Sequence, residues 1–140
     1  MADDASAPPI APRAVRALVV DDQPGIRRMV RRALGTGNVQ VDEAGDGYEG
    51  LHRASSAAYD VVLLDLHLPG LDGMTVLGRL LSSKPHQAVI VSSCRSDRAT
   101  RDECLRAGAR EFLAKPFSLV DLDACFSASL EGSRGERPAG

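Results

Sequence analysis

Residues 61–73 read VVLLDLHLPGLDG, and this stretch decides the fold. Its first four residues form an apolar run that is short enough for a strand buried on both faces, as in a parallel sheet. Asp65 ends the run, and the turn-forming residues LPGLDG follow before a helical pattern begins at Met74. A buried strand that ends in a carboxylate and leads into a helix is typical of an α/β sheet with a ligand site at its strand ends.

Three further apolar runs end in polar residues in the same way. ALVVDD ends at Asp21 and Asp22, AVIVSS ends at Ser93, and EFLAK ends at Lys115. Because parallel strands all run in one direction, we expect these side chains to gather with Asp65 at one edge of the sheet. The predicted set of three carboxylates, a hydroxyl and an ammonium suits phosphoryl chemistry.

Three neighbouring aspartates require a cation. Two carboxylates about 4 Å apart repel each other by about 4 kcal/mol at an effective dielectric constant of about 20. We expect Mg²⁺, because this ion prefers carboxylate, carbonyl and water oxygens and leaves positions open for phosphate. All but two of the 17 basic residues are arginine, so we expect Lys115 to serve where a compact ammonium is needed.

Strand and helix patterns alternate along the chain. They predict one α/β domain over residues 14–131, a doubly wound (βα)5 three-layer sandwich with the strand order 2-1-3-4-5 that is known from flavodoxin. We expect a disordered leader at 1–13 and a disordered tail at 132–140. Strands are predicted at 15–20, 39–44, 61–64, 89–92 and 111–114. Helices are predicted at 24–35, 47–57, 74–81, 97–107 and 119–130.

Composition narrows the class of protein. The net charge of −2 provides no field for capturing nucleic acid, so we expect no direct nucleic-acid binding. No signal peptide and no run of about 18 apolar residues is present, which predicts a cytoplasmic protein that does not enter a membrane. The three cysteines form no C-x-x-C pair and are interpreted as reduced thiols.

Four motifs together resemble the receiver domain of bacterial two-component response regulators. They are the DD pair at 21–22, D-x-x-L-P-G-x-D-G from Asp65, the small hydroxyl residue Ser93, and G-A-x-x-F-x-x-K-P-F at 108–117. The resemblance covers residues 15–131. It implies a receiver-like (βα)5 fold and a phosphoprotein that takes part in phosphorelay signal transduction.

The resemblance also implies roles for the acidic residues. Asp65 would accept a phosphoryl group from a sensor histidine kinase or a histidine phosphotransfer protein. Mg²⁺ would be bound directly by Asp22 and Asp65, mainly through water by Asp21, and by the backbone carbonyl of His67. For Asp22 a simple helix-capping role remains an alternative, and for Asp72 capping is the preferred interpretation.

Further residues would complete the switch. Lys115, followed by a cis peptide bond to Pro116, would pair with the phosphorylated aspartate. Ser93 would donate a hydrogen bond to a phosphoryl oxygen, and Phe112 would turn inward when Ser93 moves. Alternatively, Phe112 only fills the core.

His67 and Arg95 would modulate the lifetime of the phosphorylated state. In receivers, the side chains at these two positions flank the path of the water that hydrolyses the acyl phosphate. Both are bulky here, so we expect them to slow hydrolysis. The protein would then be no enzyme in the usual sense, but a phosphoacceptor with self-catalysed phosphotransfer and autodephosphorylation only.

We expect no effector domain after the last predicted helix. We therefore expect a single-domain regulator that signals to a downstream protein partner or a phosphorelay, and a homodimer is left open. The alternative is a phosphate-independent receiver-like adaptor. An aspartyl phosphatase is disfavoured, because its D-x-D motif would need an aspartate where His67 stands.

Overall fold

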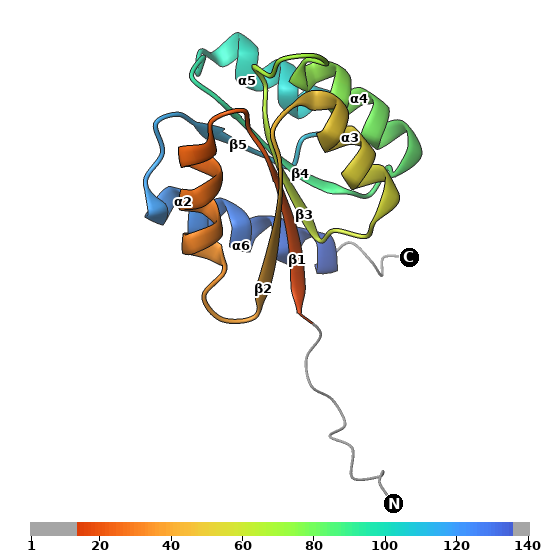
Figure 1. Cartoon of the computed structure of the whole chain (residues 1–140). Helices are drawn as coiled ribbons and strands as arrows, with labels where there is room; N and C mark the ends of the chain where they lie inside the picture. Colours follow the sequence, from red (N-terminus) through yellow and green to blue (C-terminus); the bar gives the residue numbers. More distant parts are fainter. Residues whose placement is uncertain (1–13, 136–140) are drawn as a thin grey trace, which may run out of the picture.

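Strands and helices alternate through residues 14–135, the part of the chain that this computed structural model describes (Figure 1). The predicted leader at 1–13 and the last five residues of the predicted tail lie outside the described residues. The strands are β1 (Val15–Val20), β2 (Val39–Ala44), β3 (Val61–Asp65), β4 (Ala88–Ser93) and β5 (Glu111–Ala114). The helices are α2 (Pro24–Leu34), α3 (Gly47–Ser56), α4 (Gly73–Ser83), α5 (Arg98–Arg106) and α6 (Leu119–Gly135).

The strands form one parallel sheet in the order β2-β1-β3-β4-β5. This order confirms the predicted doubly wound fold. Val20 of β1 lies beside Leu64 of β3, and Asp65 of β3 lies beside Ser92 of β4. The register therefore brings the polar ends of β1, β3 and β4 to the same edge of the sheet.

Helices cover both faces of the sheet, with α2 and α6 on one face and α3, α4 and α5 on the other (Figure 1). Alternate residues of β1 enter different cores. Leu18 and Val20 pack against α3, α4 and α5, whereas Ala17 and Val19 pack against α2 and α6. Because both faces are buried, β1 and β3 need apolar residues on both sides, which explains their continuous apolar runs.

Aspartates cap three of the helices. Asp46, Asp72 and Asp97 are the N-caps of α3, α4 and α5, and each carboxylate accepts a hydrogen bond from a backbone N–H in the first turn. The capping role of Asp72 is thus confirmed. The N-cap of α2 is Gln23, without a side-chain cap, so the interpretation of Asp22 as a helix cap is wrong.

The last helix is longer than predicted. α6 continues to Gly135, so residues 132–135 are helical where a disordered tail was expected. Each glycine in this stretch disfavours a helix by about 1 kcal/mol relative to alanine. That penalty does not end a helix whose earlier turns are anchored in the core by Leu122 and Phe126.

Lys84 joins the C-terminal ends of two helices. It is the C-cap of α4, and its Nζ donates hydrogen bonds to the carbonyl oxygens of Ala54 and Ala57, each at 2.8 Å. Carbonyl groups at a helix end have no partner within the helix, and the helix dipole favours a cation there. The ammonium therefore stabilises the end of α3 from the neighbouring helix.

Replacing Lys84 by methionine should lower the free energy of unfolding by about 1–2 kcal/mol, because two carbonyl oxygens lose a charged donor. Urea unfolding followed by circular dichroism measures the change. Arg79→Met is the matched control, since Arg79 is exposed on the same helix, and it should change stability by less than about 0.5 kcal/mol. Equal losses in the two variants would contradict the capping role.

Candidate functional site

Asp21, Asp22 and Asp65 meet where β1 and β3 end. One carboxylate oxygen of each lies within 4.8 Å of the other two. Asp21 and Asp65 expose only 2% and 4% of their surface, whereas Asp22 is exposed. The structure thus brings the three predicted carboxylates together, with Asp22 on the open side of the cluster.

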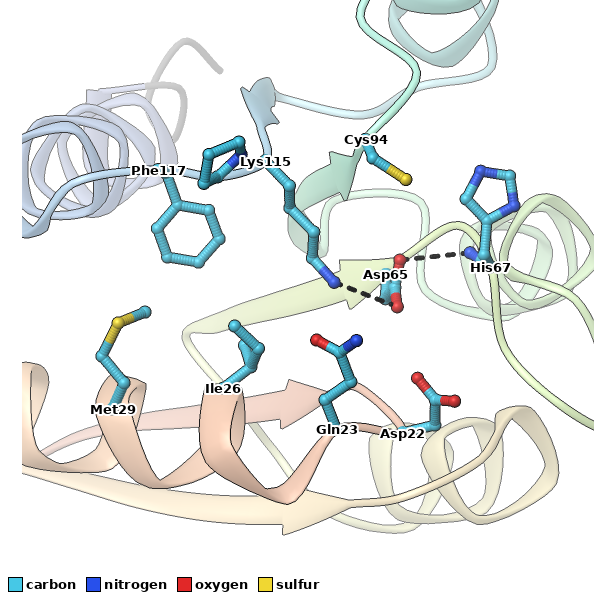
Figure 2. Close-up of a pocket in the computed structure, with 10 residues that line it drawn as sticks. Asp22, Gln23, Ile26, Met29, Asp65, His67, Cys94, Lys115 and Phe117 are labelled. Carbon is cyan, nitrogen blue, oxygen red and sulfur yellow. Dashed lines mark hydrogen bonds and ion pairs between the residues drawn. The ribbon is translucent and has the colours of Figure 1, made fainter.

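Lys115 reaches this cluster from the end of β5. Its Nζ lies 2.8 Å from Asp21 Oδ2 and 3.2 Å from Asp65 Oδ2, and Figure 2 shows the side chain extended toward Asp65. Burial alone lowers the pKa of Lys115, but hydrogen bonds and attraction from the two aspartates outweigh burial and raise it. Lys115 is therefore a fixed cation between two buried carboxylates. The Lys115–Pro116 peptide bond is cis, as the resemblance implied.

The carboxyl group of Asp65 lies where its charge is disfavoured. Burial raises its pKa, and repulsion from Asp21 raises it further. The backbone N–H of His67, which donates to Oδ1 at 3.1 Å, and the ammonium of Lys115 both lower it. The pKa remains above its ordinary value, so the ionised form is held at a cost in free energy.

The loop after Asp65 folds closely against the backbone of that residue. The N–H of Gly73 donates to the carbonyl oxygen of Leu66 at 3.0 Å. A Cβ atom on residue 73 would clash with the carbonyl oxygen of Asp65. Gly70 has a φ of 78°, which favours glycine. The pattern LPGLDG therefore fixes the chain that leads out of the site.

A cavity of about 590 Å³ opens beside Asp65 (Figure 2). Lys115 and Asp22 form its charged wall, and Ile26 and Met29 of α2 lie with Phe117 along an apolar wall. The apolar wall was not predicted. Ile26 and Met29 belong to the apolar stripe of α2, a pattern that predicts burial but does not reveal which residues of the stripe stand at the edge of the sheet.

Ser93 lies at the end of β4 with its hydroxyl buried. Its Oγ accepts a hydrogen bond from the backbone N–H of Arg95 at 2.9 Å and lies 3.4 Å from His67 Nε2. The side chain of His67 is exposed and lines the cavity. Arg95 instead extends toward Asp97, with 3.9 Å between Nε and Oδ1 and 70% of its side chain exposed. The structure thus brings His67 to Ser93, but it does not direct Arg95 toward the cluster.

Phe112 lies in β5 with its ring already buried. The residue is 9% exposed, packs in the core that contains Val91 and Cys104, and has the guanidinium of Arg101 at 6.0 Å from the ring centre. The core-filling interpretation therefore describes the ring in this structure. A movement of Phe112 on phosphorylation stays a prediction.

The cluster fits a magnesium ion. All three donor groups are carboxylates, the hard oxygen ligands that Mg²⁺ prefers. Their combined charge exceeds the single charge of Lys115, and the exposure of Asp22 leaves room for water and phosphate oxygens. The participation of the His67 carbonyl stays a prediction.

Comparison with known proteins identifies the family. The sequence model of the response regulator receiver domain matches residues 17–126. The chain belongs to this family. Over 101 residues it is 39% identical to the transcriptional regulatory protein ResD of Bacillus subtilis, covering 72% of this chain and 42% of ResD. Over 125 residues it is 37% identical to the response regulator MprA of Mycobacterium bovis, covering 89% of this chain and 54% of MprA.

Solved receiver structures share the fold. The receiver domain protein of Methanospirillum hungatei superimposes with a TM-score of 0.83 at 24% identity, covering 88% of this chain and 98% of that chain. The BeF3-activated receiver domain of DrrB superimposes with a TM-score of 0.77 at 28% identity, covering 84% of this chain and 98% of that chain. Receivers of this family are phosphoacceptors and bind Mg²⁺ at an acidic pocket, which corresponds here to the cluster of Asp21, Asp22 and Asp65.

The comparisons correct the prediction on partners. ResD is named a transcriptional regulatory protein, and IrlR of Burkholderia pseudomallei is named a transcriptional activator protein. The chain spans about half the length of these relatives. The expectation of no direct nucleic-acid binding is therefore contradicted by the relatives that this chain matches. It rested on the net charge of one receiver, which says nothing about the remaining half of a relative's chain.

The raised pKa of Asp65 predicts how stability depends on this residue. A carboxyl group whose pKa is raised in the folded state destabilises that state once it ionises, so Asp65→Asn should be more stable than wild type at pH 7.5 by about 1 kcal/mol. The gain should shrink as the pH is lowered through the folded-state pKa, since wild-type Asp65 then becomes neutral too.

Urea unfolding in EDTA at pH 7.5 and pH 5 measures this difference. Addition of Mg²⁺ should then stabilise wild type more than Asp65→Asn, because binding to the folded state raises its stability. A variant that is less stable than wild type at pH 7.5 in EDTA would contradict the electrostatic account of the cluster.

Proposed function

We propose that Asp65 accepts a phosphoryl group from the phosphohistidine of a sensor histidine kinase in a magnesium-dependent reaction. The observation that supports this function is the meeting of three carboxylates and Lys115, of which Asp22, Asp65 and Lys115 line an open cavity. Asp65 is the acceptor because it both contacts Lys115 and lines the cavity. Asp21 contacts Lys115 but is not among the residues that line the cavity, and Asp22 lines the cavity on its exposed side.

The transfer follows from the chemistry of these groups. A carboxylate oxygen of Asp65 attacks the phosphorus atom, the P–N bond breaks as the new P–O bond forms, and the imidazole leaves with the electron pair. Asp21, Asp22, Asp65 and the His67 carbonyl would hold Mg²⁺, and the ion would neutralise charge on the phosphoryl oxygens. Lys115, now shared between Asp21 and Asp65, pairs with the phosphoryl group that forms on Asp65.

Phosphorylation gives Ser93 a new acceptor. In the unphosphorylated structure its hydroxyl accepts a hydrogen bond from the backbone N–H of Arg95. Donation of the hydroxyl proton to a phosphoryl oxygen would draw the chain after β4 toward Asp65. Phe112 lies one strand farther along the sheet and responds to that movement, so the change reaches the surface of α5, β5 and α6. A shift between two existing conformations accounts for such a switch.

Self-catalysed loss of phosphate is part of the same proposal. A water molecule must approach the phosphorus atom opposite the Asp65 oxygen, through the cavity that His67 lines. His67 slows this approach by occupying space beside Ser93, and Arg95 does so when its weak contact with Asp97 is released. The protein then acts as a timed signal carrier rather than as an enzyme with an external substrate.

The single-domain form, the cytoplasmic location and the boundaries 14–131 stay predictions. Within the described residues, no helix combines the length and apolar character needed to cross a membrane.

Asp65→Asn should abolish phosphorylation, because the amide keeps the shape of the side chain but is not a nucleophile. Wild type incubated with acetyl phosphate and Mg²⁺ should gain the mass of one phosphoryl group by intact-mass spectrometry. Asp123→Asn is the matched control, since Asp123 is exposed on α6, and it should be labelled like wild type. Omission of Mg²⁺ should prevent labelling in all variants.

Two results would overturn this assignment. If Asp65→Asn is labelled as much as wild type, another residue is the phosphoryl acceptor. A wild type that takes no phosphate in Mg²⁺ would favour the alternative prediction, a phosphate-independent adaptor.

Ser93→Ala should separate phosphorylation from the switch. Backbone amide NMR of phosphorylated wild type should show shift changes from Asp65 to Phe112 and Arg106, because the hydroxyl couples the site to β5 and α5. In Ser93→Ala the changes should stay near Asp65. Ser92→Ala is the control, as Ser92 is buried in the same strand and should keep the wild-type pattern. Local changes in wild type itself would rule out the switch.

A further inference from the structure

We propose that Arg27 is a positioning residue for the acidic cluster and acts through the peptide group that joins Asp21 to Asp22. The proposal rests on the magnesium-dependent function above. Arg27 lies in the first turn of α2, where side chains point back toward the start of the helix. Its Nη1 donates a hydrogen bond to the carbonyl oxygen of Asp21 at 2.7 Å.

The guanidinium is held firmly from its other side. Nε of Arg27 donates to Oε1 of Glu43 in β2 at 3.0 Å, and Oε2 of Glu43 pairs with Arg31 Nη1 at 2.7 Å. The side chains of Arg27 and Glu43 are only 21% and 25% exposed. The fork geometry of arginine is thus used to connect β2 with the end of β1.

The contact completes the fixation of Asp21. The N–H of Asp21 donates to the carbonyl oxygen of Ala44 at 3.1 Å, and its carboxylate accepts from the N–H of Gln23 at 2.9 Å and from Lys115 at 2.8 Å. The carbonyl oxygen held by Arg27 lies in the same rigid plane as the N–H of Asp22. Arg27 therefore sets the direction in which the chain leaves Asp21 and in which the exposed Asp22 can offer its carboxylate.

The position of Arg27 argues for a geometric rather than an electrostatic effect. Its charge is paired with Glu43, and its donor is directed at a carbonyl oxygen, so it does not occupy the carboxylate oxygens that a metal ion needs. A nearby cation that acted only through its charge would repel Mg²⁺, and its removal would strengthen binding. Loss of a positioning contact weakens binding. A weaker affinity for Mg²⁺ after removal of Arg27 therefore indicates a positioning effect, and a stronger affinity indicates an effect of charge alone.

The test is a calorimetric titration of the chain of residues 1–140 with MgCl2, without phosphate. Arg27→Ala should bind Mg²⁺ more weakly by on the order of tenfold, as is usual when a group that orients a metal ligand is lost. Glu43→Gln should also weaken binding, and the double variant should be no weaker than Arg27→Ala, because both changes remove one connected contact. Arg28→Ala, which removes the same charge from an exposed neighbour, should bind as wild type or more tightly.

Unchanged or tighter Mg²⁺ binding by Arg27→Ala would overturn the proposal, as would an equal loss in Arg28→Ala. Circular dichroism in EDTA checks that each variant is folded. If Arg27→Ala is not folded, Arg27→Lys and Glu43→Gln decide, and wild-type affinity in both overturns the proposal. The proposed function fails separately, through a wild type that binds no Mg²⁺ or an Asp65→Asn variant that still takes phosphate.

Discussion

The contact of Lys115 with Asp21 and Asp65 is the interaction on which the site depends. Two ionised carboxylates at about 4 Å repel each other by about 4 kcal/mol at an effective dielectric constant of about 20, and here both are buried. Lys115 offsets part of this repulsion, but burial still raises the pKa of Asp65. At neutral pH the folded protein therefore holds excess negative charge that a further cation would relieve. This unbalanced charge explains why an acidic site of this kind binds a divalent cation.

The parallel sheet makes this crowding unavoidable. Adjacent strands that run in the same direction place their final residues at one edge of the sheet. Because Val20 is paired with Leu64, the residues that follow them, Asp21 and Asp65, lie close together. The two cores on either side of the sheet keep the strands in register. Packing of the apolar residues thus stabilises the fold against the repulsion between the clustered carboxylates. The clustered charges that the proposed function needs lower the stability of this edge of the sheet, and the two apolar cores provide the stability.

The fold could be predicted from sequence because its decisive residues are strand residues buried on both faces. The bounds of β1, β2 and β5 agree with prediction, as does the strand order. Asp21, Asp22, Asp65 and Lys115 could be placed together because each follows such a strand. The cavity wall formed by Ile26, Met29 and Phe117 could not, since it depends on the spacing between α2 and the chain after β5. The contact of Arg27 with a backbone carbonyl could not be predicted either, because every residue has such a carbonyl and no sequence pattern indicates which one a side chain contacts.

The two lysines show how residue choice reflects geometry in a chain that otherwise uses arginine. Lys115 contacts two carboxylates, and Lys84 contacts two carbonyl oxygens at a helix end. In each case one compact ammonium serves two oxygens that converge on a point. Arg27 instead connects an acceptor on β2 with one just after the end of β1, which suits a planar fork. The preference for arginine elsewhere therefore makes each lysine informative, and the same argument that singled out Lys115 applies equally to Lys84.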